Sequence, residues 1–214
     1  MPKPLTITAI CGWAVPKRWF EHLIHQRFPN YLANVIYPQN PLNQTESKSI
    51  LSKITSDLII GYSLGSLWIL YYRHYISPRI KIALLAPILA LPKEHKLGGK
   101  ISEIQIKYIS KMISRNPDDN SPILSFYNLS GFQPPDSLLN EFTDKERLIN
   151  GLRFLYTARA SGQIESDIIS IIGETDPLLD AEILKHYIPN LIIIPHKGHA
   201  PEPLLDRLSK DLIL

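Results

Sequence analysis

The sequence predicts an α/β protein with a mostly parallel sheet of six strands and helices on both faces. Short apolar runs alternate along the chain with amphipathic segments, which is the order of elements in a doubly wound sheet. Several runs consist of isoleucine and leucine alone, as at 58–60 and 192–194, a pattern typical of strands buried on both faces. A length of 214 residues suits one domain, or one domain that carries an insertion.

Each strand is expected where an apolar run is followed by turn-forming residues. In the first run, apolar residues alternate with Thr6 and Thr8, which is a strand pattern. The expected strands are Leu5–Ile10, Asn34–Tyr37, Asp57–Gly61, Ile80–Ala86, Asp167–Gly173 and Leu191–Pro195. The helices expected between and after them are Pro16–Phe28, Glu46–Ile54, Leu64–Ile76, Pro177–Tyr187 and Pro201–Leu212.

One connection is much longer than an ordinary crossover. Residues 87–166 separate the fourth and fifth expected strands, and their pattern is helical. In the helix expected at Lys100–Ser114, one face carries Ile101, Ile104, Tyr108 and Met112. Residues 143–146 have the pattern of a capping box that opens a second helix with an apolar stripe of Leu148, Leu152 and Leu155. We therefore expect a helical lid, 87–166, inserted into a core of residues 1–86 and 167–214.

Composition excludes several classes of protein. Hydrophobic residues make up 44% and charged residues 20% of the chain, so it is neither disordered nor collagen-like. The longest apolar run, Ile82–Leu91, is interrupted by Pro87 and is far shorter than the roughly 20 residues of a membrane-spanning helix. A net charge of +3 and a single cysteine argue against a nucleic-acid-binding protein and a cysteine-rich zinc site. We expect a cytoplasmic protein without a cleaved leader, a metal or an organic cofactor.

Residues 61–65 read Gly-Tyr-Ser-Leu-Gly and lie between the third expected strand and the helix after it. This is the Gly-x-Ser-x-Gly nucleophile elbow in the strand–turn–helix context that it requires. On so tight a turn Ser63 projects its hydroxyl above the sheet, and the glycines remove Cβ atoms that would collide. The helix N-terminus supplies the backbone N–H of Leu64 where an oxyanion would form. The alternative is an ordinary strand–loop–helix corner.

A serine nucleophile needs a base and an acid that orients the base. In sheets of this kind the order along the chain is serine, acid, histidine, with the last two just after a strand. Asp176 follows the fifth expected strand and His199 follows the sixth, so both fall at the carboxyl edge of the sheet, where ligands bind. We therefore predict a triad of Ser63, His199 and Asp176.

Other choices of acid and base stay open in the sequence. Asp176 could instead cap the helix that follows it, and then Asp180 or Glu174 would be the acid. His196 is the nearest rival base, but it lies closer to the strand end and lacks the preceding glycine of His199.

The loop after the first strand supplies the second expected oxyanion donor. Gly12 lets the backbone approach the substrate, and the N–H of Trp13 would pair with that of Leu64. Cys11 has no histidine or asparagine arranged for it, so we interpret it as a buried structural thiol. The residues expected to contact the substrate are Gly12, Tyr62, Phe126, Tyr127, Phe132 and Tyr156. Plain packing is the alternative for the aromatic residues of the lid.

Taken in order, these residues resemble the α/β-hydrolase superfamily. Its oxyanion loop, elbow, acid and base are matched by 11–13, 61–65, Asp176 and 198–199. The resemblance covers the chain from Leu5 to the C-terminus. Because the first strand here matches the superfamily's third, the chain resembles a trimmed version without the two leading strands.

A narrower resemblance is carried by Gly12-Trp13, the elbow and 199–201, which reads His-Ala-Pro. These residues resemble the pimeloyl-[acyl-carrier protein] methyl ester esterases of biotin biosynthesis, the BioH type in a short form. Two positions depart from the family pattern. Cys11 stands where a histidine is usual, and residues 37–41 read Tyr-Pro-Gln-Asn-Pro in place of an Asp-x-x-Gly turn.

This resemblance implies a serine carboxylesterase that removes a methyl ester from a pimeloyl chain lying under the lid. It also implies an acidic acyl-carrier protein docked on the lid, where residues 93–115 contain six basic and two acidic residues. The docking residues implied are Lys100, Lys107, Lys111 and Arg115. Simple solvation of these side chains is the alternative. An acyl thioesterase, a general small-ester hydrolase and a non-catalytic binding protein with the same fold are the rival functions.

Overall fold

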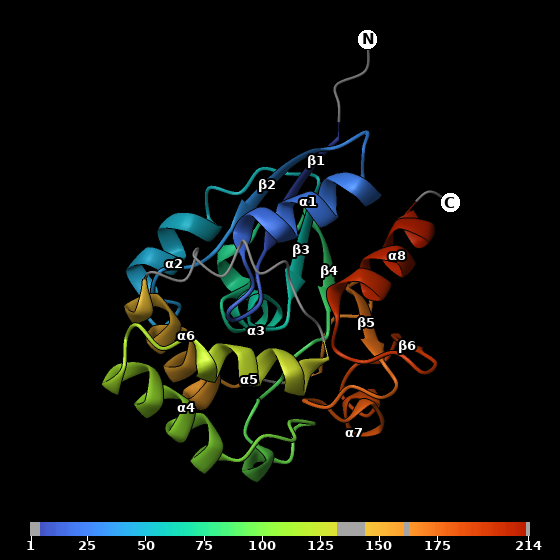
Figure 1. Cartoon of the computed structure of the whole chain (residues 1–214). Helices are drawn as coiled ribbons and strands as arrows, with labels where there is room; N and C mark the ends of the chain where they lie inside the picture. Colours follow the sequence, from blue (N-terminus) through green and yellow to red (C-terminus); the bar gives the residue numbers. More distant parts are fainter. Residues whose placement is uncertain (1–4, 132–143, 161–162, 213–214) are drawn as a thin grey trace.

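The computed structural model describes residues 5–131, 144–160 and 163–212. Six parallel strands form one sheet in the order β2-β1-β3-β4-β5-β6 (Figure 1). The strands are β1 (Thr6–Ile10), β2 (Leu32–Ile36), β3 (Leu58–Tyr62), β4 (Lys81–Leu85), β5 (Ile169–Gly173) and β6 (Leu191–Ile194). The α/β class, the six strands and the helical insert after the fourth strand are thus confirmed, and the sheet is parallel throughout rather than mostly parallel.

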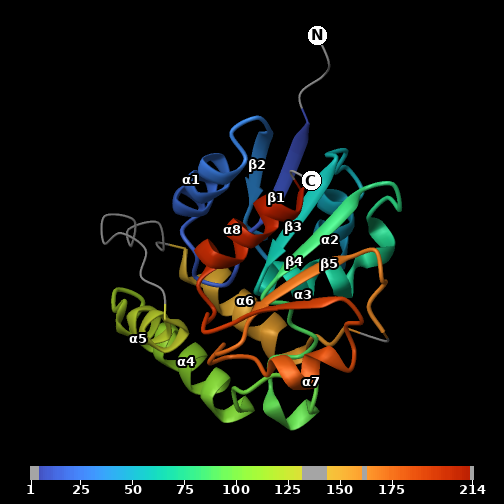
Figure 2. The same ribbon diagram turned by 90° about the vertical axis from the view of Figure 1, so that its right-hand side faces the viewer.

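Helices cover both faces of the sheet (Figure 2). On one face lie α1 (Lys17–Arg27) and α8 (Pro201–Leu212), which are joined by an Arg27–Asp206 ion pair of 2.7 Å. On the other lie α2 (Gln44–Leu51) and α3 (Leu64–Tyr71), which are joined by the Trp68 indole N–H donating to Ser47 Oγ at 2.9 Å. Every residue of β3 is buried between these layers, which explains its unbroken apolar run.

α3 and the helix that follows β5 are much shorter than the sequence predicts. α3 ends at Tyr71 and is followed by a 3₁₀ turn, Arg73–Tyr75, where one continuous helix was expected. The helix expected at 177–187 is reduced to α7 (Ala181–Lys185). Asp180 begins α7 because its carboxylate accepts the N–H groups of Glu182 and Ile183, both at 3.1 Å.

The insert, residues 87–166, packs its helices at the carboxyl edge of the sheet (Figure 1). They are α4 (Glu103–Arg115), α5 (Ser121–Ser130) and α6 (Lys145–Thr157), preceded by a 3₁₀ turn at Lys93–His95. The sequence analysis did not predict α5. None of the helices in the described ranges is both long enough and apolar enough to cross a membrane.

The predicted packing face of α4 is wrong. Ile104 and Tyr108 are 77% and 62% exposed, whereas Ile106 and Ile113 are buried. Apolar residues occur on both faces of this helix, and the packing of α4 against α6 selects the face that carries Ile106. The other face is left in solvent with apolar and basic side chains side by side.

The first turn of α6 is attached to the core. The predicted stripe of Leu148, Leu152 and Leu155 is buried, but the cap is Asp144, whose carboxylate accepts the N–H of Arg147 at 3.0 Å. Thr143, which begins the predicted capping box, lies outside the described residues. The side-chain amide of Gln39 donates to the Asp144 carboxylate at 2.5 Å. This hydrogen bond is the main reason why the pKa of Asp144 is lower than usual.

Replacing Asp144 with alanine is expected to lower the free energy of unfolding by about 1 kcal/mol at neutral pH, because the helix loses its cap. Since folding lowers the pKa of Asp144, its charge stabilises the fold above the ordinary aspartate pKa of 3.8 and ceases to do so as the pH falls through the lowered value. Urea unfolding of wild type and variant should therefore show a smaller difference at about pH 3 than at neutral pH. Asp144→Asn keeps a capping oxygen and removes only the charge, so it separates the effect of the charge from that of the cap. If wild type and Asp144→Ala differed in unfolding free energy by the same amount at both pH values, this account would be contradicted.

Candidate active site

The elbow forms the turn that its sequence requires. Ser63 joins β3 to α3 with a φ of 53°, a left-handed conformation that is strained for a residue with a side chain. A Cβ on Gly65 would lie 2.4 Å from the carbonyl oxygen of Ile10, and one on Gly61 would lie 2.5 Å from the Ile69 side chain. Both glycines are therefore needed for the close approach of α3 to the sheet.

The structure brings the three predicted triad residues together. His199 Nδ1 lies 2.7 Å from Asp176 Oδ2, and His199 Nε2 lies 3.0 Å from Ser63 Oγ. Asp176, His199 and Ser63 are 0%, 1% and 4% exposed. An imidazole that donates from Nδ1 to the carboxylate leaves Nε2 free to accept the serine proton.

The rival acids and the rival base are engaged elsewhere. The carboxylate of Asp180 caps α7. The carboxylate of Glu174 accepts the backbone N–H of His196 at 2.8 Å, and the His196 side chain is 92% exposed. The glycine that distinguished His199 has room for a side chain, since the nearest atom to a Cβ on Gly198 would lie at 3.9 Å.

Tight backbone packing places the acid and the base. A Cβ on Gly173, the last residue of β5, would lie 2.2 Å from the carbonyl oxygen of Lys197. Thr175 donates to the same oxygen from its N–H at 2.9 Å and from its hydroxyl at 3.0 Å. The Asp176 oxygen that does not contact His199, Oδ1, accepts the N–H groups of Leu178 and Leu179 at 2.8 and 3.1 Å. The acid loop and the base loop are thus fixed to each other.

Tyr62 has a different position from the one predicted. The sequence analysis expected it to contact the substrate, but its ring is 1% exposed and its hydroxyl donates to the carbonyl oxygen of His199 at 2.8 Å. Burial raises the pKa of this phenol well above the ordinary value, so the hydroxyl keeps the proton that it donates. Tyr62 therefore holds the backbone of His199 in place. Gly12 lies against the Tyr62 ring, because a Cβ on Gly12 would be 2.9 Å from it.

Lys100 is also placed differently. Its ammonium group donates to the backbone carbonyl of Asp176 at 2.7 Å, and its N–H donates to the carbonyl of Leu178 at 2.9 Å. It belongs to the surroundings of the acid rather than to an open basic face. The other predicted docking residues, Lys107, Lys111 and Arg115, are exposed on α4.

The two predicted oxyanion donors lie at the same edge of the sheet. Trp13 follows β1 by three residues, Leu64 is the first residue of α3, and both are buried. Within the described ranges, neither backbone N–H donates to a protein acceptor. Buried N–H groups are almost always paired, so this arrangement suits an anionic oxygen of a ligand.

The remaining predicted contacts belong to the insert. Phe126 meets the Trp13 ring edge-on at 4.8 Å. Tyr127 is buried and donates its hydroxyl to the carbonyl of Ala14. The Tyr156 hydroxyl donates to Glu103 at 3.0 Å, which ties α6 to α4. Phe132 lies outside the described residues. Cys11 is fully buried, as expected of a structural thiol.

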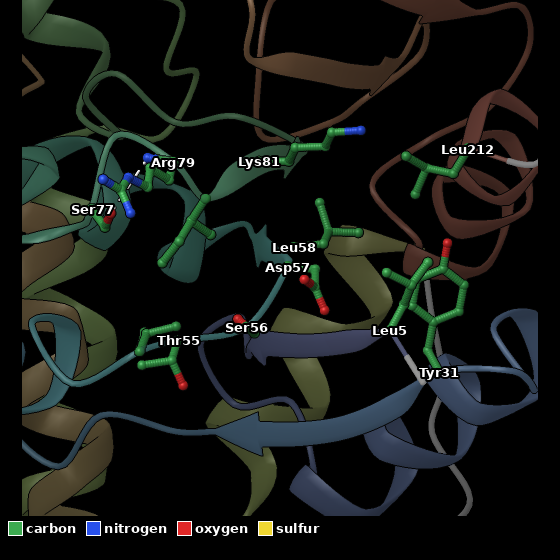
Figure 3. Close-up of a pocket in the computed structure, with 12 residues that line it drawn as sticks. Leu5, Tyr31, Thr55, Ser56, Asp57, Leu58, Ser77, Arg79, Lys81 and Leu212 are labelled. Atoms are coloured by element: carbon green, nitrogen blue, oxygen red, sulfur yellow. Dashed lines mark hydrogen bonds between the residues drawn. The ribbon is translucent and has the colours of Figure 1, made fainter. Parts of the chain in front are cut away.

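A cavity of about 680 Å³ lies far from these residues (Figure 3). It is lined by Leu5, Ser56, Asp57 and Lys81, among others, at the amino ends of β1, β3 and β4. Ser63 follows the carboxyl end of β3, so the cavity is at the opposite edge of the sheet. Across the described residues, no group of three or more His, Cys, Asp or Glu side chains is arranged to hold a metal ion.

A parallel sheet of this order, with a serine elbow after β3, an acid after β5 and a histidine after β6, is the α/β-hydrolase fold. Solved structures agree. The Cif epoxide hydrolase from Acinetobacter nosocomialis has a TM-score of 0.67 and 14% identity, over 99% of this chain and 83% of that one. The RedJ thioesterase of the prodiginine pathway in Streptomyces coelicolor has a TM-score of 0.58 and 14% identity, over 97% and 85%. BioG from Haemophilus influenzae has a TM-score of 0.55 and 12% identity, over 92% and 89%.

These similarities establish the fold and no more, because the identities are low. No family model matches the chain, and no curated protein matches its sequence. What the protein does must therefore be argued from its own residues.

Proposed function

We propose that the protein is a serine carboxylesterase that uses Ser63, His199 and Asp176 as its triad. One observation carries the proposal: a buried chain of two hydrogen bonds, of 2.7 and 3.0 Å, runs from the acid through the imidazole to the serine hydroxyl. A binding protein would gain nothing from a strained serine aligned with a buried imidazole and carboxylate.

The reaction follows from this geometry in two steps. His199 Nε2 takes the Ser63 proton as Oγ attacks the ester carbonyl, and Asp176 stabilises the imidazolium that forms. The N–H groups of Trp13 and Leu64 stabilise the oxyanion of the tetrahedral intermediate. The alcohol leaves with the proton from His199, and an acyl-enzyme remains. Water, deprotonated by His199, then attacks the acyl carbon, and the acid is released as the proton returns to Ser63.

Within this class, we propose a pimeloyl-[acyl-carrier protein] methyl ester as the substrate. The resemblance of 12–13, 61–65 and 199–201 to esterases of biotin biosynthesis supports this choice. The exposed face of α4 supports it too, since apolar Ile104 and Tyr108 lie there with three basic residues. An acidic carrier protein would be attracted to such a face. The insert, 87–166, would then act as the lid over the acyl chain.

The second candidate is an acyl thioesterase. Two of the structures to which the chain is similar are described as thioesterases, RedJ and the type II enzyme YbtT of the yersiniabactin pathway. The same triad would cleave a thioester with a thiol as the leaving group.

Substrate comparison separates these candidates. Purified protein should be given methyl pimeloyl-carrier protein, p-nitrophenyl esters and acyl thioesters, with Ser63→Ala as the blank for each. The proposal expects the highest kcat/KM for the carrier-bound methyl ester and rescue of a biotin auxotroph that lacks its methyl esterase. A preference for thioesters, or soluble protein that fails to rescue, would overturn the methyl esterase assignment.

Reversing the charge of the exposed α4 face is expected to weaken the binding of the carrier-bound substrate and of no other substrate. In Lys111→Glu/Arg115→Glu, KM for methyl pimeloyl-carrier protein should rise by about tenfold, while kinetics with p-nitrophenyl acetate should stay unchanged, because steering depends on charge outside the reaction centre. Lys48→Glu/Lys53→Glu, with one lysine in α2 and one just after it, makes the same change in net charge outside the insert and serves as the control. An equal effect of both pairs would show that overall charge, not docking on α4, is responsible.

A further inference from the structure

Ala14, the residue after the proposed oxyanion donor Trp13, is held by two tyrosine hydroxyls. Its N–H donates to the hydroxyl of Tyr37 at 2.8 Å, and its carbonyl accepts the hydroxyl of Tyr127 at 2.5 Å. Tyr37 follows β2 in the core, whereas Tyr127 lies on α5 of the insert. The core and the insert therefore hold the two sides of one residue.

This residue needs external support. The φ of Ala14 is 55°, in the left-handed region that a residue with a side chain adopts only when its surroundings impose it. The two hydroxyls bond to the two polar groups of Ala14 itself. The peptide that joins Trp13 to Ala14 carries the N–H held by Tyr37, so support on both sides of Ala14 restricts the loop that contains Trp13.

The insert contacts the proposed oxyanion donors at other points as well. The indole N–H of Trp13 donates to the carbonyl of Leu148 on α6 at 2.8 Å. A Cβ on Gly151 of the same helix would lie 2.8 Å from the Trp13 ring and 3.2 Å from the Leu64 side chain. The absence of a side chain at Gly151 thus lets α6 pack against the side chains of both residues whose backbone N–H groups are the proposed oxyanion donors.

The two tyrosines differ in what they offer. Burial raises the pKa of Tyr37, so its hydroxyl remains neutral and accepts from Ala14. Its ring is covered by Arg147 of α6, whose guanidinium carbon lies 4.8 Å from the ring centre. Tyr127 is itself buried and acts as the donor, and it is the hydroxyl that comes from the insert.

We propose that Tyr127 is a positioning residue through which the insert sets the oxyanion hole, an inference that rests on the proposed esterase function. Tyr127 touches no reacting atom. It holds the carbonyl of Ala14, while Tyr37 holds the N–H of the same residue. Because Ala14 directly follows Trp13, this support restricts the loop that presents the Trp13 N–H. An insert packed in place completes the oxyanion hole, and an insert displaced from the core leaves it incomplete.

If Tyr127 positions the oxyanion hole, its loss should reduce stabilisation of the transition state without changing the binding of the substrate. An oxyanion-hole donor contributes about 10²–10³ to kcat, and a misplaced donor loses part of that factor. Tyr127→Phe keeps the ring and removes the hydroxyl, so kcat for p-nitrophenyl acetate should fall by about 10- to 100-fold, with KM within about twofold of wild type. The affinity of a trifluoromethyl ketone, which forms an oxyanion on Ser63, should fall by the same factor as kcat/KM.

Tyr75→Phe is the matched control. It also removes a tyrosine hydroxyl that takes part in a hydrogen bond, here as the acceptor of the Gln44 side-chain amide at 2.7 Å in the 3₁₀ turn after α3. Its kinetics should equal those of wild type. Tyr37→Phe removes the opposite hydroxyl and should also lower kcat, which keeps the test decisive if Tyr127→Phe does not fold.

The outcomes are distinct. If wild type neither hydrolyses the ester nor reacts with a fluorophosphonate, the proposed function fails and Tyr127 is not the cause. If wild type is active and Tyr127→Phe retains its kcat, the positioning role is wrong. If kcat falls but the affinity for the ketone is unchanged, the hydroxyl acts on something other than the oxyanion hole, and the inference is again overturned.

Discussion

Ser63→Ala is expected to lower kcat by about 10³-fold or more while the protein keeps its fold. The substitution removes the only atom that could attack the carbonyl in the proposed reaction. The fold should be little affected, because the side chain loses only a hydroxyl whose hydrogen bond is to His199 Nε2 at 3.0 Å. Esterase assays with circular dichroism spectra of both proteins measure activity and fold together.

A fluorophosphonate probe gives a second readout of the same assignment. Wild type should be labelled, the labelled peptide should contain Ser63, and Ser63→Ala should stay unlabelled. Ser209→Ala, a change of the same kind at a partly exposed position of α8, should behave as wild type. Residual activity near that of wild type in Ser63→Ala would contradict the nucleophile assignment.

Asp176→Asn is expected to lower kcat by about 10³- to 10⁴-fold through a change of tautomer. The two N–H groups of Leu178 and Leu179 point at one oxygen of the side chain, at 2.8 and 3.1 Å. In the variant only the amide oxygen can accept them, so the amide NH₂ must face His199 Nδ1. The imidazole would then carry its proton on Nε2, where it cannot accept the proton of Ser63.

Asp180→Asn is the control for this substitution. Asp180 was one of the two rival acids in the sequence, and its carboxylate caps α7 in the structure, a role that asparagine performs equally well. At neutral pH, the kcat of Asp180→Asn should equal that of wild type. Loss of activity in Asp180→Asn with retention in Asp176→Asn would transfer the role of the acid to Asp180.

The main features of the fold were predictable because they depend on short-range patterns. Continuous apolar runs mark strands with two buried faces, and β3 is of this kind. The elbow was predictable because its two glycines are required by contacts of 2.4 and 2.5 Å. Asp176 and His199 could be placed because each follows a strand of a parallel sheet.

Other features depended on tertiary contacts that no local pattern reveals. The helix α4 has apolar residues on two faces, and only its packing on α6 determines that Ile106 is buried and Ile104 exposed. Tyr62 was expected to contact the substrate, but the alternation of a strand turns its ring toward the core and the carbonyl of His199. The contact of Lys100 with Asp176 joins residues that are 76 positions apart.

The hydrogen bond between Lys100 and Asp176 bears on how the protein could be re-engineered. Gly99 pairs with Leu179, and a Cβ on it would lie 1.9 Å from the carbonyl oxygen of Leu91. The stretch from 91 to 100 is therefore built into the scaffold beside Asp176, although it comes after β4 in the chain. A transplant of helices from a protein of the same fold should place its upstream junction beyond Ser102, because a junction at the end of β4 would remove the lysine that donates to the backbone of Asp176.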